Sequence, residues 1–328
     1  MAEQQMTTAL SEWTNTITDL VVRDFQGNGV QFDDYAKNCA MNAMSSIYQL
    51  VKGSGEEMKN IDTSNLREIV GQCASLKLNA NSFPKECYFQ LRKKKIGDNY
   101  VQTVEFGIEG AGHESLLRKF GINVDKVYDW WIVKEGDDFV YPKRRGMKVE
   151  PPEWTPKGLS EKTERVVLPI LLNDGTETYL ISERDSVKTN FFAHVRNNLM
   201  NETFGICQNR YKASEEQKKQ IDAKKEEIYS ALRKCETLED MIHCPEAQPY
   251  ISGAWLDTTE SMVIRKMQNN AVRRFPKEFD NMAKQSYVQM DDTFKVAQEE
   301  IEEKANQIPF EATEQDIIDG VAVEVTGE

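Results

Sequence analysis

The fold of this chain is decided by residues 86–108, which read ECYFQLRKKKIGDNYVQTVEFGI. Segments 86–92 and 100–108 are rich in aromatic and β-branched residues, which favour strands, and the basic segment between them has the composition of a hairpin loop. Alternate residues of the second segment share one face: Tyr100, Gln102, Val104 and Phe106. The stretch therefore predicts an antiparallel hairpin with a positively charged tip.

Two helices are expected before this hairpin. Apolar residues recur at helical spacing over residues 36–51, and again in a segment that Asn65 and Glu68 can open as a capping box. Cys39 and Cys73 fall on the apolar positions of these helices. We therefore expect reduced thiols in a core rather than a disulfide framework.

Strand patterns continue after the hairpin. A short helix is predicted over residues 110–120, followed by strands at 124–134 and 139–141. A second hairpin is expected at 166–172 and 176–182, joined through Asn-Asp-Gly, a sequence typical of tight turns. The middle of the chain thus predicts a meandering sheet crossed by a helix.

Beyond residue 183 the pattern becomes helical. Ser214 and Gln217 form a capping box that opens a highly charged helix to about Cys235, with a narrow apolar stripe. This helix lies in a segment, about 207–250, that we interpret as a helical insertion. A further helix, which Asp257 and Glu260 can cap, is predicted from about Thr259 to Phe275.

Charge is unevenly distributed along the 328 residues. The formal net charge is −13, but residues 291–328 hold 12 acidic and two basic side chains, so this segment alone contributes −10. Such a composition favours a disordered acidic tail. The chain is therefore divided into an N-terminal helical segment at 1–60, a main domain at 61–290 and a tail at 291–328.

Several function classes are disfavoured. No window approaches the roughly 18 uninterrupted apolar residues of a transmembrane helix, so we expect a cytoplasmic protein without a membrane partner. No Walker loop is present, and the Cys and His residues lack zinc-site spacing. The pairs Asp137-Asp138 and Asp291-Asp292 are better explained as turn and tail residues than as magnesium ligands. We expect no cofactor, no metal site and no catalytic chemistry.

Basic residues interleaved with aromatics are the positive signal. One cluster, Arg92 to Lys95, is flanked by Tyr88 and Tyr100 of the same hairpin, and another joins Lys143 and Arg144 to nearby Tyr and Trp residues. Cations bind phosphates and aromatic faces stack on unpaired bases, so this pairing is typical of single-strand binding. Taken alone, either cluster is also compatible with an ordinary solvated loop.

The helix at 259–275 favours the binding interpretation. At 100° per residue its apolar side chains fill one half of the helical wheel. The other half carries four cations and two amides without an acidic residue: Arg265, Lys266, Asn269, Asn270, Arg273 and Arg274. An ordinary solvated helix mixes its charges, so this helix predicts a surface for a nucleic-acid backbone.

Four segments, in order, resemble the RecT-type branch of the RecT/Red-beta superfamily of phage single-strand annealing proteins. They span about residues 36–280 and read QCASLKL from 72, VQ at 101 with GIEG from 107, EGDDF from 135, and AVRR from 271 after Trp255 and Met262. The chain departs from the family pattern at three places. Lys77 replaces a glycine, and Glu109 stands where an arginine is usual. The family's Lys-Lys-Thr triplet reads here as Gln268-Asn269-Asn270, or else Met262 is displaced by about one helical turn.

The resemblance implies an α+β fold with a small antiparallel β-β-β-α core and flanking helices, which agrees with the strand pattern. It also implies ATP-independent and Mg²⁺-independent annealing of complementary single strands by a homo-oligomeric ring or filament, in phage recombination within a bacterial host cell. A phage exonuclease and a host single-strand binding protein are the implied partners. The residues expected on DNA are Arg92, Lys93, Lys94, Lys143, Arg144, Arg265, Lys266, Arg273 and Arg274 for phosphates, with Tyr88, Tyr100 and Trp255 for stacking.

Two alternatives remain open. A passive single-strand binder or loader would bind DNA but slow its pairing. A helical interaction scaffold would use the charged helix and the tail to recruit partners, with the basic helix merely solvated.

Overall fold

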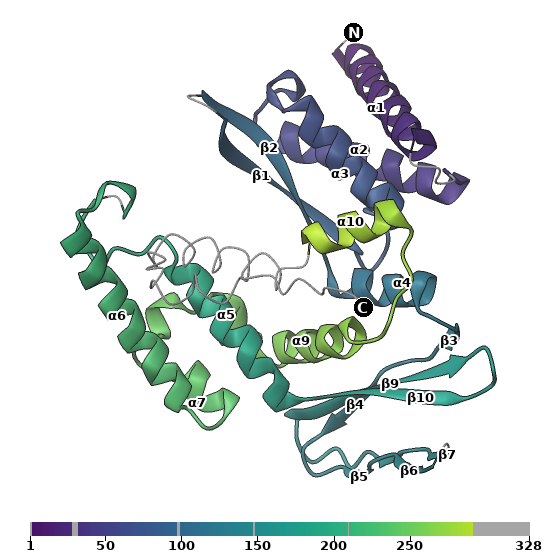
Figure 1. The fold of residues 1–328 in the computed structure, drawn as a ribbon, viewed down its shortest axis with the longest axis vertical. Coiled ribbons are helices and arrows are strands. Elements are labelled where there is room, and N and C mark those ends of the chain that lie inside the picture. Colours follow the sequence, from purple (N-terminus) through teal and green to yellow (C-terminus); the bar gives the residue numbers. More distant parts are fainter. Residues whose placement is uncertain (1, 28–31, 97–98, 147, 209, 291–328) are drawn as a thin grey trace, which may run out of the picture.

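The structure is a computed structural model, which describes residues 2–27, 32–96, 99–146, 148–208 and 210–290. The expected acidic tail at 291–328 lies outside these ranges. Figure 1 shows helices and small antiparallel sheets, so the coarse α+β prediction is confirmed. Among the described helices, none is long and apolar enough to cross a membrane.

The first half of the molecule is a hairpin covered by helices. Strands β1 and β2 pair antiparallel from Cys87 with Ile108 to Ile96 with Asn99, so pairing extends beyond the strand ends that we expected. The helices and the strands share one hydrophobic core, to which residues 1–60 also contribute. Its elements are α1 (Ala2–Gly27), α2 (Asp34–Gly53), α3 (Thr63–Ser75), β1 (Cys87–Ile96), β2 (Asn99–Ile108) and α10 (Asn281–Met290).

The start of α3 differs from the prediction. Asp62 caps this helix by accepting hydrogen bonds from the backbone N–H groups of Ser64 and Asn65. The Asn65 side chain instead bonds both backbone groups of Val104 in β2, at 2.7 and 3.1 Å. Asn65 therefore joins the helix to the hairpin. Cys39 and Cys73 are free and buried, as expected.

A four-stranded antiparallel sheet lies on the other side of α4 (Gly110–Phe120) and α9 (Thr259–Arg273) from the hairpin (Figure 1). The order is β10-β9-β3, and β4 also pairs with β9. The single strand predicted at 124–134 is thus divided into β3 and β4. The elements of this half are α4 (Gly110–Phe120), β3 (Val124–Val127), β4 (Trp131–Lys134), β9 (Thr163–Leu172) and β10 (Glu177–Glu183).

Two short ladders, β5–β8 and β6–β7, extend from this sheet. Figure 1 places them beyond the sheet, on the side away from α9. Their strands are β5 (Asp138–Val140), β6 (Lys143–Arg145), β7 (Lys148–Glu150) and β8 (Glu153–Thr155).

The remaining helices surround a second core. The Ser214–Gln217 capping box at the start of α6 is confirmed, whereas α5 was not predicted. The helices are α5 (Val187–Leu199), α6 (Glu215–Lys234), α7 (Leu238–Ile242), α8 (Gly253–Asp257) and α9 (Thr259–Arg273), with 3₁₀ turns at Met58–Asn60, Arg184–Ser186, Arg210–Lys212 and Gln248–Tyr250.

Helix α9 lies at the centre of the molecule, in contact with α4, α5, β9 and β10. Its first turn is fixed by Arg184, which is buried and forms ion pairs with Glu239 at 2.7 Å and Glu260 at 2.6 Å. Glu260 also accepts a hydrogen bond from the backbone N–H of Thr163 in β9. Glu260 was expected to cap the helix, but it joins α9 to the sheet instead.

Candidate nucleic-acid interface

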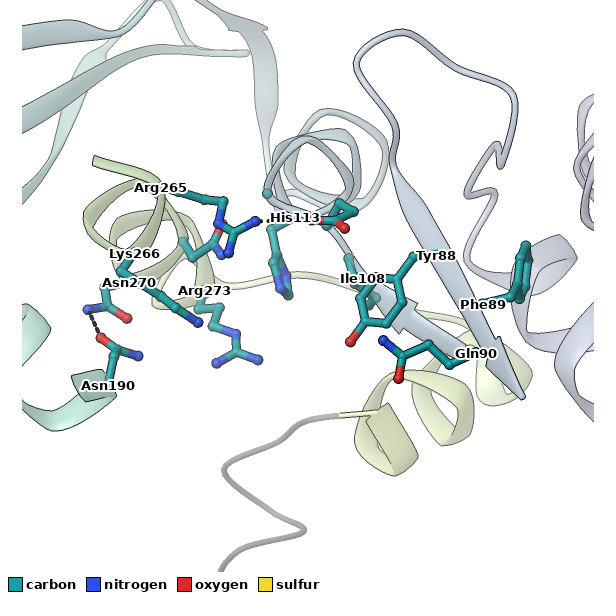
Figure 2. Close-up of a pocket in the computed structure, with 13 residues that line it drawn as sticks. Tyr88, Phe89, Gln90, Ile108, His113, Asn190, Arg265, Lys266, Asn270 and Arg273 are labelled. Atoms are coloured by element: carbon teal, nitrogen blue, oxygen red, sulfur yellow. Dashed lines mark hydrogen bonds and ion pairs between the residues drawn. The ribbon is translucent and has the colours of Figure 1, made fainter. Parts of the chain in front are cut away.

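A cavity of about 440 Å³ lies between the β1–β2 hairpin and α9. Figure 2 shows the side chains of α9 on one side and those of β1 on the other, with His113 of α4 between them. The lining residues are Tyr88, Phe89, Gln90, Ile108, Glu109, Gly110, His113, Asn190, Arg265, Lys266, Asn269, Asn270 and Arg273.

The α9 wall follows the predicted helical wheel. Val263, Met267, Ala271 and Val272 are buried against neighbouring elements. The opposite side lines the cavity with three of the four predicted cations and both amides. Asn270 is held in place because its amide nitrogen donates to Oδ1 of Asn190 in α5, at 2.7 Å.

Small residues at the start of α4 allow α9 to approach closely. A Cβ added to Gly110 would lie 3.3 Å from Oδ1 of Asn269 and 3.4 Å from Cγ of Arg265. A Cβ on Gly112 would lie 2.0 Å from the carbonyl oxygen of Glu86, which precedes β1. The glycines thus bring the hairpin, α4 and α9 together, and with them the walls of the cavity.

The β1 wall is built by strand alternation. Tyr88, Gln90 and Arg92 share the face of β1 that is opposite to the core-packing residues Phe89 and Leu91. The ring of Tyr88 lies over Gly107, its partner in β2, where an added Cβ would come within 2.2 Å of Cζ. Tyr88 is 39% exposed and lines the cavity.

His113 occupies the floor of the cavity and is only 6% exposed. Burial, together with the positive charges of Arg273, Lys277 and Lys266, lowers the pKa of His113 to about 3. Its Nδ1 atom has no hydrogen-bond partner within the described part of the chain, and neither has Oδ1 of Asn269. Burial and Arg273 also lower the pKa of Lys277 to about 8.

The charge lining the cavity is predominantly positive. The described lining residues include three cations, Arg265, Lys266 and Arg273, and one carboxylate, Glu109, which lies 3.7 Å from Arg265. The cavity also adjoins the N-terminus of α4, where the first backbone N–H groups carry partial positive charge. This surface is suited to an anion.

Because side chains alternate along β1, the cations predicted on the hairpin lie on opposite faces of the strand. Arg92 lies on the Tyr88 face, but its guanidinium donates to Glu105 at 2.8 Å, so it is partly neutralised. Lys93 lies on the opposite face, with Phe89 and Leu91. The side chains of Lys94 and Tyr100 lie outside the part of the structure that is described.

Other predicted ligands lie elsewhere. Lys143 and Arg144 are exposed in β6, on the far side of the sheet from α9, and they do not line the cavity (Figure 1). Arg274 is exposed at the C-terminal end of α9 and does not line the cavity. The sequence pattern found these cations but could not show which of them converge.

The prediction for Trp255 is wrong. Its side chain is 1% exposed and packs edge-on against Phe191, with ring centroids 5.1 Å apart, in the core of the helical half. A base cannot reach this ring without unfolding α8. Trp255 is therefore a core residue.

Sequence reasoning did not assign seven of the cavity residues to the site: Phe89, Gln90, Ile108, Glu109, Gly110, His113 and Asn190. The close Gly110-Ala111-Gly112 spacing before His113 was the available signal, because small residues permit close approach of other elements. In the residues that the structure covers, no cluster of three or more His, Cys, Asp or Glu side chains could hold a metal ion.

A second cavity, of about 620 Å³, lies on the other side of the α4–α9 contact. It shares Glu109, Gly110 and Arg265 with the first cavity and is also lined by Lys85 and Trp130. The Trp130 indole donates to Glu114 at 2.9 Å. Basic and aromatic groups thus continue past the Glu109–Arg265 pair.

No family model matches the chain, and no curated protein matches it.

Proposed function

We propose that the chain binds single-stranded DNA in the cavity between β1 and α9 and anneals complementary strands without ATP. The observation that carries the binding is the polar side of α9, which sets three cations opposite the exposed ring of Tyr88. Cations bind phosphates of any sequence and an aromatic ring stacks on any base, so this arrangement suits a sequence-independent single-strand binder. The annealing step rests on the resemblance to the RecT-type proteins.

The backbone at Lys77 supports that resemblance. Lys77 has a φ of 51°, which lies in the left-handed region that glycine adopts readily. The family usually has glycine at this position, so the chain keeps the backbone shape that the glycine would take. The ammonium group pairs with Asp33 at 2.5 Å and joins the end of α3 to the start of α2.

The finer fold and the partners belong to the same proposal. The β-β-β-α core would correspond to β1, β2 and β3 arranged around α4, although the hairpin and β3 belong to separate sheets among the described residues. A homo-oligomeric ring or filament, a phage exonuclease, a host single-strand binding protein and the bacterial cytoplasm are carried over from the resemblance.

Annealing is tested with two complementary oligonucleotides, one fluorescent and one quenching, without a nucleotide cofactor. We expect pairing to be faster than in the protein-free mixture. A rate no faster than protein-free pairing would overturn annealing. A passive binder would show salt-sensitive binding and slower pairing, and an interaction scaffold would show no binding even at low salt.

A further inference from the structure

The floor of the cavity contains an unsatisfied polar atom. His113 is buried in the first turns of α4, yet its Nδ1 has no hydrogen-bond partner in the described structure. A buried polar atom without a partner is unfavourable, and such an atom at a cavity wall is one that a ligand can satisfy. His113 therefore marks a position for a ligand group.

The groups that face His113 define the ligand. Lys266 and Arg273 extend from α9, Lys277 follows that helix, and Tyr88 faces the cavity from β1 (Figure 2). Among the described residues that line this cavity, Glu109 is the only carboxylate, and it pairs with Arg265. A cationic pocket next to a helix N-terminus favours a compact anion.

We propose that this part of the cavity is a proton-coupled phosphate subsite, in which one backbone phosphodiester accepts a hydrogen bond from Nδ1 of His113 and is neutralised by Lys266 and Arg273. The inference rests on the proposed function, because it names where a single phosphate of the bound strand lies. It also assigns a ligand to a histidine that the sequence did not single out.

Proton coupling follows from the charges. Without a ligand, burial and three neighbouring cations keep the imidazole neutral. A bound phosphate adds negative charge, which favours the imidazolium form and raises the pKa of His113. Binding then takes up a proton, so the affinity increases as the pH falls through the raised pKa, by at most about tenfold per pH unit.

Lys277 titrates in a different range. Its pKa of about 8 places its loss of charge above neutrality, where it would weaken binding of an anion as the pH rises. Its Nζ already donates to the carbonyl oxygens of Val272 and Phe275. The window from about pH 5 to 7 therefore reports on histidine rather than on this lysine.

The direct test is an NMR titration of the full-length protein with labelled histidine rings. The probes are inorganic phosphate and a short oligothymidylate, and the pKa of His113 is measured with and without each. We expect both probes to raise it. This titration uses the unsubstituted protein, so it tests the phosphate subsite even if a substitution of the buried His113 disturbs folding.

The matched variants are His113→Asn and His243→Asn. Asn keeps a donor close to the Nδ1 position but does not titrate, so His113→Asn should lose the increase in affinity toward pH 5. His243 is exposed after α7 and away from the cavity, and its variant should keep that increase.

The outcomes separate the two proposals. Oligothymidylate binding with an unchanged His113 pKa and the same pH dependence in His113→Asn would overturn the subsite but not the proposed function. A phosphate-induced rise of the pKa without oligothymidylate binding at low salt would support the subsite as an anion site and overturn single-strand binding. No response to either probe would overturn both.

Discussion

Gly107 has no side chain, and the ring of Tyr88 occupies the space that a side chain would fill. We expect Gly107→Ala to displace the ring, because the new Cβ would lie 2.2 Å from it. Stacking on a base contributes about 1–3 kcal/mol, so the affinity for oligothymidylate should fall roughly fivefold or more. Fluorescence anisotropy with a labelled oligonucleotide measures this loss.

Gly71→Ala is the control for that substitution. Gly71 lies inside α3, and an added Cβ would meet nothing within 4 Å. Replacing a glycine within a helix with alanine stabilises it by up to about 1 kcal/mol, while DNA affinity should not change. An equal loss of affinity in both variants would mean that Tyr88 is not a stacking surface.

Trp255→Ala separates a core role from a stacking role. Because the side chain is fully buried, we expect the free energy of unfolding to fall by about 3–5 kcal/mol. Urea denaturation followed by circular dichroism measures it, and Trp255→Phe should lose less. If Trp255→Ala keeps its stability but binds DNA weakly, then Trp255 acts in DNA binding rather than in the core.

At the scale of elements, the periodicity of the sequence predicted the features that depend only on residues within one helix or strand. The apolar stripe of α9 packs as its spacing indicates, and the capping box of Ser214 begins α6. Local patterns failed where a tertiary contact uses the same residue. Asn65 bonds β2 instead of capping α3, and Glu260 binds Arg184 instead of capping α9.

The salt dependence of binding tests α9 as an element. Each phosphate neutralised on a single strand contributes about −0.7 to the slope of log affinity against log salt. Lys266→Ala with Arg273→Ala should therefore make the slope about 1.4 less steep, whereas Lys143→Ala with Arg144→Ala on β6 should not change it. A reversed pattern would move the interface to the β6–β7 ladder.

At the scale of the molecule, the site could be predicted only in part. Its cations were visible because they cluster on one helix, but His113 and Asn190 reach the cavity from α4 and α5, which are distant in sequence from α9. No spacing rule connects such positions. The same limit explains Trp255, since the residues next to it in the sequence do not show whether its side chain packs in the core or lies at the surface.

Deleting residues 299–328 tests how charge is divided along the chain. This segment carries ten acidic residues and one basic residue, so it repels DNA phosphates or competes with them for the cations of the cavity. We expect the truncated protein to bind oligothymidylate more tightly or equally well at low salt. Weaker binding would show that the segment contributes to the DNA-binding assembly.

The two walls of the cavity belong to different hydrophobic cores, because β1 packs with α1–α3 and α9 packs with α5 and the β9–β10 sheet. Residues that pack in one core tend to unfold locally as one unit, so each wall of the cavity should have its own free energy of local unfolding. We expect amide hydrogen exchange to report two protection levels, one for β1–β2 and one for α9. A bound strand that contacts both walls would then link the two units and slow exchange in each.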